Sequence, residues 1–227
     1  MQWLIDLLLF FFPVNCLICG KRLSSRWSVL CLGCENRMPR TGFLDTPDNP
    51  VSKIFWGRAP VEIGTSLLRF EKGSAYQKLL HELKYRGNQK TGMYLGRLLG
   101  HEIRKSSFKH CDLIVPVPIH KKRLRERGYN QSELIARGVS EAMKIPLQTD
   151  LLKRTKHARS QTSMGRYERY VNVQNSFHLS DNPPDLNGKR ILLIDDVVTT
   201  GATLEACSLV LSCHYTCRIY VATVSCA

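Results

Sequence analysis

The sequence predicts an α/β protein in which helices flank a parallel β-sheet and a small four-cysteine segment precedes the sheet. Short apolar runs at 113–117, 189–194 and 218–224 alternate with stretches of helical periodicity, which is the pattern that crossover connections between parallel strands produce. Hydrophobic residues make up 43% of the 227 residues, which is enough for a packed core. Two Cys-x-x-Cys pairs lie near the N-terminus, ahead of this alternation.

The four N-terminal cysteines have the spacing of a zinc site. Eleven residues separate the two pairs, and two such pairs can bring four thiolates to one tetrahedral ion. Two disulfides would need an oxidising compartment, for which the sequence offers no export signal, and free thiols are the other alternative. We expect a closed, structural Zn²⁺ site in a segment that spans 1–45, with the ligands Cys16, Cys19, Cys31 and Cys34.

The first thirteen residues are almost entirely apolar. No basic region precedes the apolar run, Asp6 interrupts it, and no small-residue cleavage site follows, so a signal peptide is not predicted. The run has roughly twelve apolar positions, whereas a membrane span needs about twenty. We therefore predict no transmembrane segment, but a short apolar helix over 1–13 that ends at Pro13 and packs on the domain or on a partner. Contact of this helix with a membrane surface is left open.

Proline and glycine residues predict a linker over 46–60, between the zinc segment and a main domain over 61–227. Within the main domain, apolar runs predict strands at 61–70, 113–117, 147–152, 189–194 and 218–224. Helical spacing of apolar residues predicts helices at 76–85, 92–103, 132–143 and 203–212.

The segment 191–203, which reads ILLIDDVVTTGAT, has the features of a sugar-phosphate site. Backbone N–H groups of the Thr/Gly loop and the N-terminus of the following helix suit a phosphate. A phosphate does not need the adjacent carboxylates Asp195 and Asp196, whereas sugar hydroxyls donate hydrogen bonds to such groups. A nucleotide-binding P-loop is excluded, because the sequence contains no G-x-x-x-x-G-K-[ST]. The alternative is an ordinary strand–turn–helix with a solvated acidic turn.

All thirteen positions of this segment resemble the phosphoribosyl diphosphate (PRPP) motif of type I phosphoribosyltransferases. The resemblance implies a type I phosphoribosyltransferase-like fold. It also implies that Asp195 and Asp196 are the catalytic pair and hold the 2′- and 3′-hydroxyls of the ribose. The 5′-phosphate would then lie in the loop made of Val198, Thr199, Thr200, Gly201, Ala202 and Thr203.

A second functional region follows the strand predicted at 113–117. Pro116 and Pro118 end that strand, which places the next turn at the strand's carboxyl end, where open α/β sheets bind ligands. Basic residues then gather in two stretches, and the net charge of +14 suits a nucleic acid, a phosphorylated small molecule or an acidic lipid surface. We expect diphosphate or DNA to bind through Lys121, Lys122, Arg123, Arg125, Arg127, Arg154, Arg159 and Arg166.

The order of these features along the whole chain resembles the ComF family of competence-associated proteins. The shared features are an apolar N-terminus, the four cysteines, the PVP turn, RGYNQ at 127–131, a basic stretch and the PRPP motif. The resemblance implies a cytoplasmic bacterial protein that handles imported single-stranded DNA in natural transformation, with a competence helicase or other uptake proteins as partners. It also implies that Val117 and Pro118 contact the diphosphate of PRPP, which would carry Mg²⁺.

Three functions are compatible with these features. The first is a module that binds PRPP and single-stranded DNA during DNA uptake. The second is a phosphoribosyltransferase of nucleotide metabolism, because the sequence contains the sugar-phosphate motif but no recognisable element that would choose an acceptor. The third is a zinc-stabilised scaffold for partner proteins. We favour the first.

Overall fold

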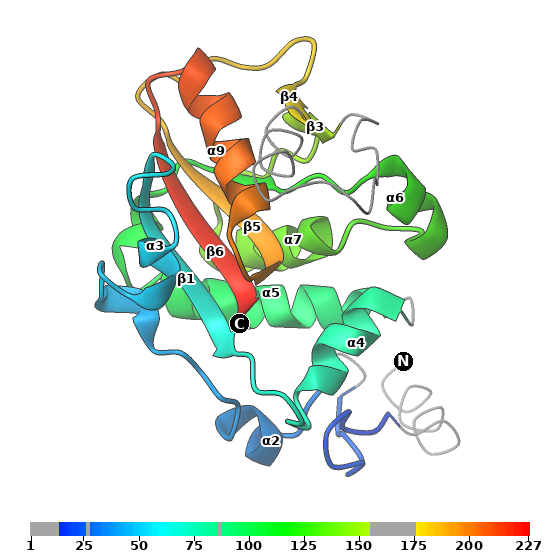
Figure 1. Ribbon diagram of the computed structural model, residues 1–227. Helices are drawn as coiled ribbons and strands as arrows, with labels where there is room; N and C mark the ends of the chain where they lie inside the picture. Colours follow the sequence, from blue (N-terminus) through cyan, green and yellow to red (C-terminus); the bar gives the residue numbers. More distant parts are fainter. Residues whose placement is uncertain (1–13, 26–27, 86–87, 155–175) are drawn as a thin grey trace, which may run out of the picture.

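A four-stranded parallel sheet forms the centre of the protein, as the sequence predicts (Figure 1). The computed structural model describes residues 14–25, 28–85, 88–154 and 176–227. The strand order is β1 (Val61–Arg69), β6 (Arg218–Cys226), β5 (Arg190–Val198), β2 (Leu113–Pro116), and every neighbouring pair is parallel. The apolar runs 191–194 of β5 and 219–222 of β6 are buried because both faces of the sheet are covered.

Helices cover the two faces of the sheet. On one face, α5 (Gln89–Ile103) and α7 (Gln131–Met143) pack on Leu192 and Ile194 of β5. On the other face, α9 (Ala202–His214) packs on Ile191 and Leu193, which alternate with the first pair along the strand. The helix α4 (Gln77–Tyr85) adds to the first face, and the 3₁₀ turn η2 (Ser107–His110) precedes β2.

The close contact between α5 and α7 requires glycine. A Cβ atom on Gly96 would lie 2.1 Å from the carbonyl oxygen of Ile135, and one on Gly138 would lie 2.4 Å from that of Met93. The two helix backbones therefore touch along this line, and larger side chains stand on either side of it.

The secondary structure differs from the sequence analysis in three places. The basic residues after the PVP turn, to which the sequence analysis assigns no element, form a helix, α6 (Lys121–Arg127). The strand predicted at 147–152 is wrong, because only Leu147 bridges to Ile114, and the short strand β3 (Leu152–Arg154) pairs antiparallel with β4 (Phe177–Leu179) instead. The strand β5 also continues past the acidic pair to Val198, because it keeps pairing with β6 there.

The N-terminal part is joined to the edge of the sheet. Its elements are α2 (Leu32–Asn36), η1 (Phe43–Asp45) and α3 (Pro50–Lys53). The N–H of Arg69 donates to the carbonyl of Pro39 at 2.9 Å, and the N–H of Thr41 donates to that of Leu67 at 3.1 Å. The segment 46–60 contains α3 and buries Val51 and Phe55, so it is packed into the core rather than extended as a linker.

The apolar helix expected over 1–13 lies outside the described residues. Within the part of the chain that the structure describes, no helix is long and apolar enough to cross a membrane.

Candidate functional site

A hollow of about 160 Å³ opens where the carboxyl ends of β2 and β5 lie side by side. It collects residues from six segments: the turn after β2, the helix α6, the start of α7 with its cap, the strand β3, the end of β5 and the start of α9. Eight residues that the sequence singles out line it: Val117, Pro118, Arg123, Arg127, Arg154, Asp195, Asp196 and Thr203.

Asp195 is the most strongly perturbed group of this hollow. Its carboxylate accepts a 2.8 Å hydrogen bond from the Ser132 hydroxyl and a 2.9 Å bond from the backbone N–H of Asp196. Burial, together with the negative charge of Asp196, nevertheless raises the pKa of Asp195 to about 7. A ligand that brings hydroxyl donors would favour the ionised form, because the carboxylate would then regain the hydrogen bonds that burial removes.

The loop that follows β5 forms a smaller adjoining hollow of about 70 Å³, lined by residues 197–204 and Asp195. Gly201 adopts a φ of +76° directly before α9, and no side chain of the described residues caps the first turn of that helix. Backbone N–H groups and the positive end of the helix dipole therefore face this hollow, which suits a phosphate.

The packing around Gly201 explains why this position is glycine. A Cβ atom there would lie 2.4 Å from Cγ2 of Ile54 and 3.1 Å from Cε1 of Phe55. The residues directly after α3 thus support the loop from behind, although the sequence analysis placed 46–60 in a linker.

Arg58 is a second support that sequence reasoning missed. Its Nη1 donates to the backbone carbonyls of Ile54 and Thr200, each at 3.2 Å. Its Nη2 lies 2.5 Å from Oε2 of Glu205, and Glu205 is only 1% exposed. The guanidinium therefore joins α3, the loop and α9, and no local sequence signal could pair residues 147 positions apart.

Asn130 organises the opposite wall. Its Nδ2 donates to the carbonyl of Val117 at 3.0 Å, while its Oδ1 accepts from the N–H of Ser132 at 3.2 Å and caps α7. The neighbouring Gln131 is 3% exposed and lines the hollow, and within the described residues its Nε2 has no hydrogen-bond partner. An acceptor on a ligand would satisfy this buried donor.

The basic residues divide into groups. Arg123, Arg127 and Arg154 line the hollow. Arg154 lies over the Phe177 ring at 5.0 Å from its centroid, and burial together with the charge of Arg123 lowers its pKa. An anion bound in the hollow would relieve this repulsion. The remaining predicted residues do not line the hollow: Lys121, Lys122 and Arg125 are exposed on α6, whereas Arg159 and Arg166 lie outside the described residues.

The four N-terminal cysteines are distant in sequence from the residues of this hollow, and their side chains lie close together in the structure. Their Sγ atoms all lie within 4.8 Å of one another, and those of Cys19 and Cys31 are 3.7 Å apart. Zn–S bonds of about 2.3 Å in a tetrahedron place sulfur atoms about 3.8 Å apart, so the cluster fits a zinc ion. Arg37 donates to Sγ of Cys34 at 3.8 Å, and the Tyr76 hydroxyl donates to the carbonyl of Cys34 at 2.7 Å. The Tyr76 contact ties the cluster to the main domain, and the Arg37 contact is local to the cysteine segment.

Comparison with known proteins agrees with this arrangement. The family described as "Phosphoribosyl transferase domain" matches residues 130–225. Competence protein F of Haemophilus influenzae is 32% identical over 137 residues, which cover 59% of this chain and 60% of that protein. DNA utilization protein YhgH of Escherichia coli K12 is 31% identical over 130 residues, or 56% of each chain. Competence protein ComFC of Streptococcus pneumoniae is 25% identical over 212 residues, which cover 85% of this chain and 90% of that protein.

The chain thus spans less than two thirds of the first two relatives and most of the third. The matched domain contains the acidic pair and the loop before α9, and the four-cysteine cluster lies ahead of it. Together these similarities support a ComF-family protein, in which a region that matches the phosphoribosyl transferase domain follows a cysteine cluster.

Proposed function

We propose that this protein binds PRPP in the hollow at the ends of β2 and β5, binds single-stranded DNA on the adjoining basic surface, and acts in the cytoplasm in DNA uptake. The observation that carries the proposal is the meeting of an acidic pair, an uncapped helix N-terminus and three arginines at one edge of the sheet. A sugar that bears phosphates at both ends matches this combination of groups.

Each part of PRPP has a counterpart in the hollow. The 5′-phosphate would accept from the backbone N–H groups of 199–203, and the ribose hydroxyls would donate to Asp195 and Asp196. The diphosphate would lie between the turn at Val117 and Pro118 and the arginines of α6. Mg²⁺ bound to the diphosphate would neutralise part of its charge, and the nearby carboxylates are hard oxygen donors that suit this ion.

Two observations support DNA as the second partner. Three cations are exposed on α6 and do not line the PRPP hollow: Lys121, Lys122 and Arg125. Relatives of this chain carry the names competence protein and DNA utilization protein. Exposed cations beside a phosphate-binding hollow would attract a single strand by counterion release, whatever its sequence.

Phosphoribosyl transfer to an acceptor is the second candidate function. The raised pKa of Asp195 and the close approach of Arg123 and Arg154 favour this function. Shifted pKa values and crowded like charges are common at sites where a protein stabilises charge that develops during a reaction. In this case the arginines would balance the charge of the departing diphosphate, and Asp195 and Asp196 would orient the ribose.

Isothermal calorimetry of the zinc-loaded protein with PRPP and Mg²⁺ tests the proposal. We expect micromolar binding for the wild type and at least a hundredfold loss for Asp195→Asn/Asp196→Asn. The exposed substitution Asp150→Asn is the control and should leave the affinity unchanged. Equal affinity of all three proteins would contradict the ribose assignment. Release of diphosphate in the presence of nucleobases or amines would favour the transferase.

A further inference from the structure

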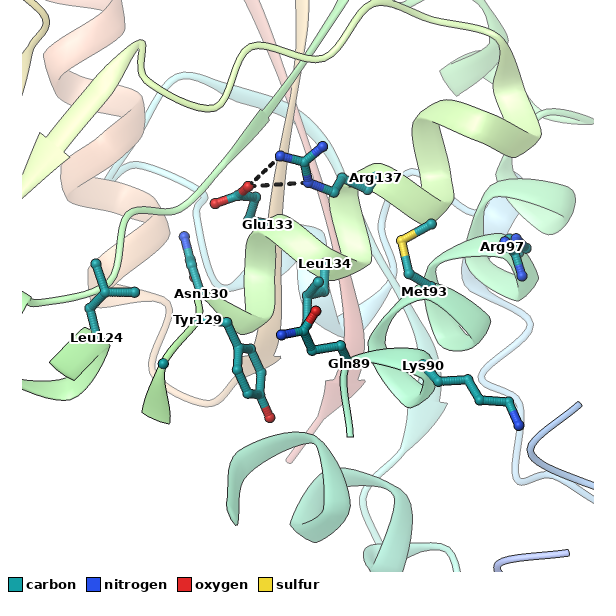
Figure 2. Close-up of a pocket in the computed structure, with 11 residues that line it drawn as sticks. Gln89, Lys90, Met93, Arg97, Leu124, Tyr129, Asn130, Glu133, Leu134 and Arg137 are labelled. Carbon is teal, nitrogen blue, oxygen red and sulfur yellow. Dashed lines mark hydrogen bonds and ion pairs between the residues drawn. The ribbon is translucent and has the colours of Figure 1, made fainter. Parts of the chain in front are cut away.

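A cavity larger than the PRPP hollow lies beside it. It is an open groove of about 710 Å³ on the outer side of the contact between α5 and α7, closed at one end by α6 and the loop after it (Figure 2). It is lined by Gln89, Lys90, Met93, Arg97, Leu124, Gly128, Tyr129, Asn130, Glu133, Leu134 and Arg137.

The floor of the groove is apolar and part of it is open to solvent. Met93 and Leu134 come from facing turns of the two helices, and Leu124 reaches over from α6. Leu124 is 41% exposed, which makes it one of the large exposed apolar side chains of the described residues. The groove therefore offers an uncovered surface on which a flat or apolar group can pack.

The rim of the groove is polar and mainly cationic. Arg137 pairs with Glu133 at 2.7 Å (Figure 2). Arg97 pairs with Glu141 at 2.9 Å, so both arginines are partly neutralised. Lys90 has no carboxylate within ion-pair distance among the described residues, and burial lowers its pKa. The carboxamide of Gln89 adds a donor and an acceptor beside the floor.

The groove and the PRPP hollow share a wall. Asn130 lines both, and α6 turns Arg123 and Arg127 toward the hollow while Leu124 lines the groove. Lys121, Lys122 and Arg125 are exposed on the same short helix. A chain-like anion could therefore pass from the groove across α6 to the edge of the hollow without leaving a basic surface.

We propose that the α5–α7 groove binds single-stranded nucleic acid, with bases on the apolar floor and phosphates at Lys90, Arg97 and Arg137. This inference rests on the proposed function, because it locates the DNA that the function requires. An apolar floor, a carboxamide that can both donate to and accept from a base edge, and a cationic rim together match a base and its phosphate.

Two pairs of matched variants test the groove. Leu124→Glu places a carboxylate on the floor, and Leu32→Glu makes the same change at the 78% exposed leucine of the cysteine segment. Lys90→Glu reverses a charge at the rim. Lys105→Glu does so at an exposed position beyond the other end of α5, about 22 Å along the helix axis.

Binding of a fluorescent oligothymidylate is measured by anisotropy over a range of salt concentrations, with melting curves to confirm folding and calorimetry to confirm PRPP binding. We expect Leu124→Glu and Lys90→Glu to weaken binding about tenfold, with a salt slope lower by about 1 for Lys90→Glu. Both controls should stay within about threefold of the wild type, and all variants should keep their PRPP affinity.

The outcomes separate this inference from the function on which it rests. No binding of oligonucleotide by the wild type would remove both the DNA role and the groove. Binding that Lys121→Glu weakens but the groove variants do not would keep the DNA role and overturn the groove. Displacement of the oligonucleotide by polyglutamate of equal charge would show that the groove takes an acidic protein, and would also overturn the inference.

Discussion

The Ser132 hydroxyl donates a 2.8 Å hydrogen bond to Oδ1 of Asp195, across 63 positions of sequence. It joins the first turn of α7 to the end of β5, and so connects the RGYNQ segment to the acidic pair. Because Asn130 caps the same helix and binds the carbonyl of Val117, one short segment fixes both walls of the hollow.

Replacing Ser132 by alanine should raise the pKa of Asp195 above about 7, because the hydroxyl hydrogen bond favours the ionised carboxylate. At pH 7 the variant should bind PRPP roughly tenfold more weakly, and part of the loss should be recovered at pH 8.5. NMR titration of the carboxyl carbon and calorimetry measure both effects. The exposed substitution Ser107→Ala should reproduce the wild type, and an unchanged carboxyl titration in Ser132→Ala would contradict the role of this bond.

The titration of Asp195 predicts how stability depends on pH. The unfolded chain loses this proton near pH 3.8, whereas the folded protein keeps it until about pH 7. Between these values the folded state binds more protons, so this group's contribution to stability falls as pH rises. The stability of the wild type relative to Asp195→Asn should therefore decrease from pH 4 to pH 8 in urea unfolding. A difference that does not change between pH 4 and pH 8 would mean that the pKa of Asp195 is not raised.

Gly201→Ala should destabilise the protein and weaken PRPP binding. The alanine must adopt a φ of +76° and place its Cβ within 2.4 Å of Ile54. Gly188→Ala is the matched control, because Gly188 has a φ of +73° but a Cβ atom there would meet no described atom within 4 Å. Backbone strain of about 1 kcal/mol should affect both variants, and the steric clash should affect only the first. Equal unfolding free energies would show that α3 does not press on the loop.

Arg58→Met should lower stability by about 1–3 kcal/mol, because the buried carboxylate of Glu205 loses a charged partner. The double substitution Arg58→Met/Glu205→Gln should recover part of this loss, because the remaining group is neutral. Urea unfolding of both variants measures the effect. If the double variant is no more stable than the single one, the ion pair is not what holds the loop to α9.

Removal of zinc should unfold the N-terminal segment and lower the melting temperature, because metal binding and folding are coupled in so small a unit. Cys19→Ser should lose the metal, measured by atomic absorption, and reproduce the effect of a chelator. Cys213→Ser changes an exposed cysteine outside the cluster and should retain one zinc ion per chain. Retention of zinc by Cys19→Ser would remove the four-cysteine site.

Local patterns were sufficient to predict several parts of this protein. The Cys-x-x-Cys spacing predicted a cluster whose sulfur atoms the fold does bring together, because the two cysteines of each pair are only three residues apart, on a turn in the first pair and at the start of α2 in the second. The segment 191–203 predicted a strand, a loop and a helix, because burial on both faces of a sheet demands a continuous apolar run. The parallel pairing of the strands follows the same logic, since alternating strands and helices build parallel sheets.

The rest depended on contacts between distant segments. The helical form of α6, the pairing of β3 with β4, and the packing of α3 behind Gly201 have weak local signals, and tertiary packing selects them. The sequence by itself determined which chemical groups the protein carries and which strand or turn holds them. Only the tertiary structure decided that Ser132, Arg58 and the α5–α7 groove lie beside that chemistry, because side-chain contacts across many residues depend on how the elements pack and not on local periodicity.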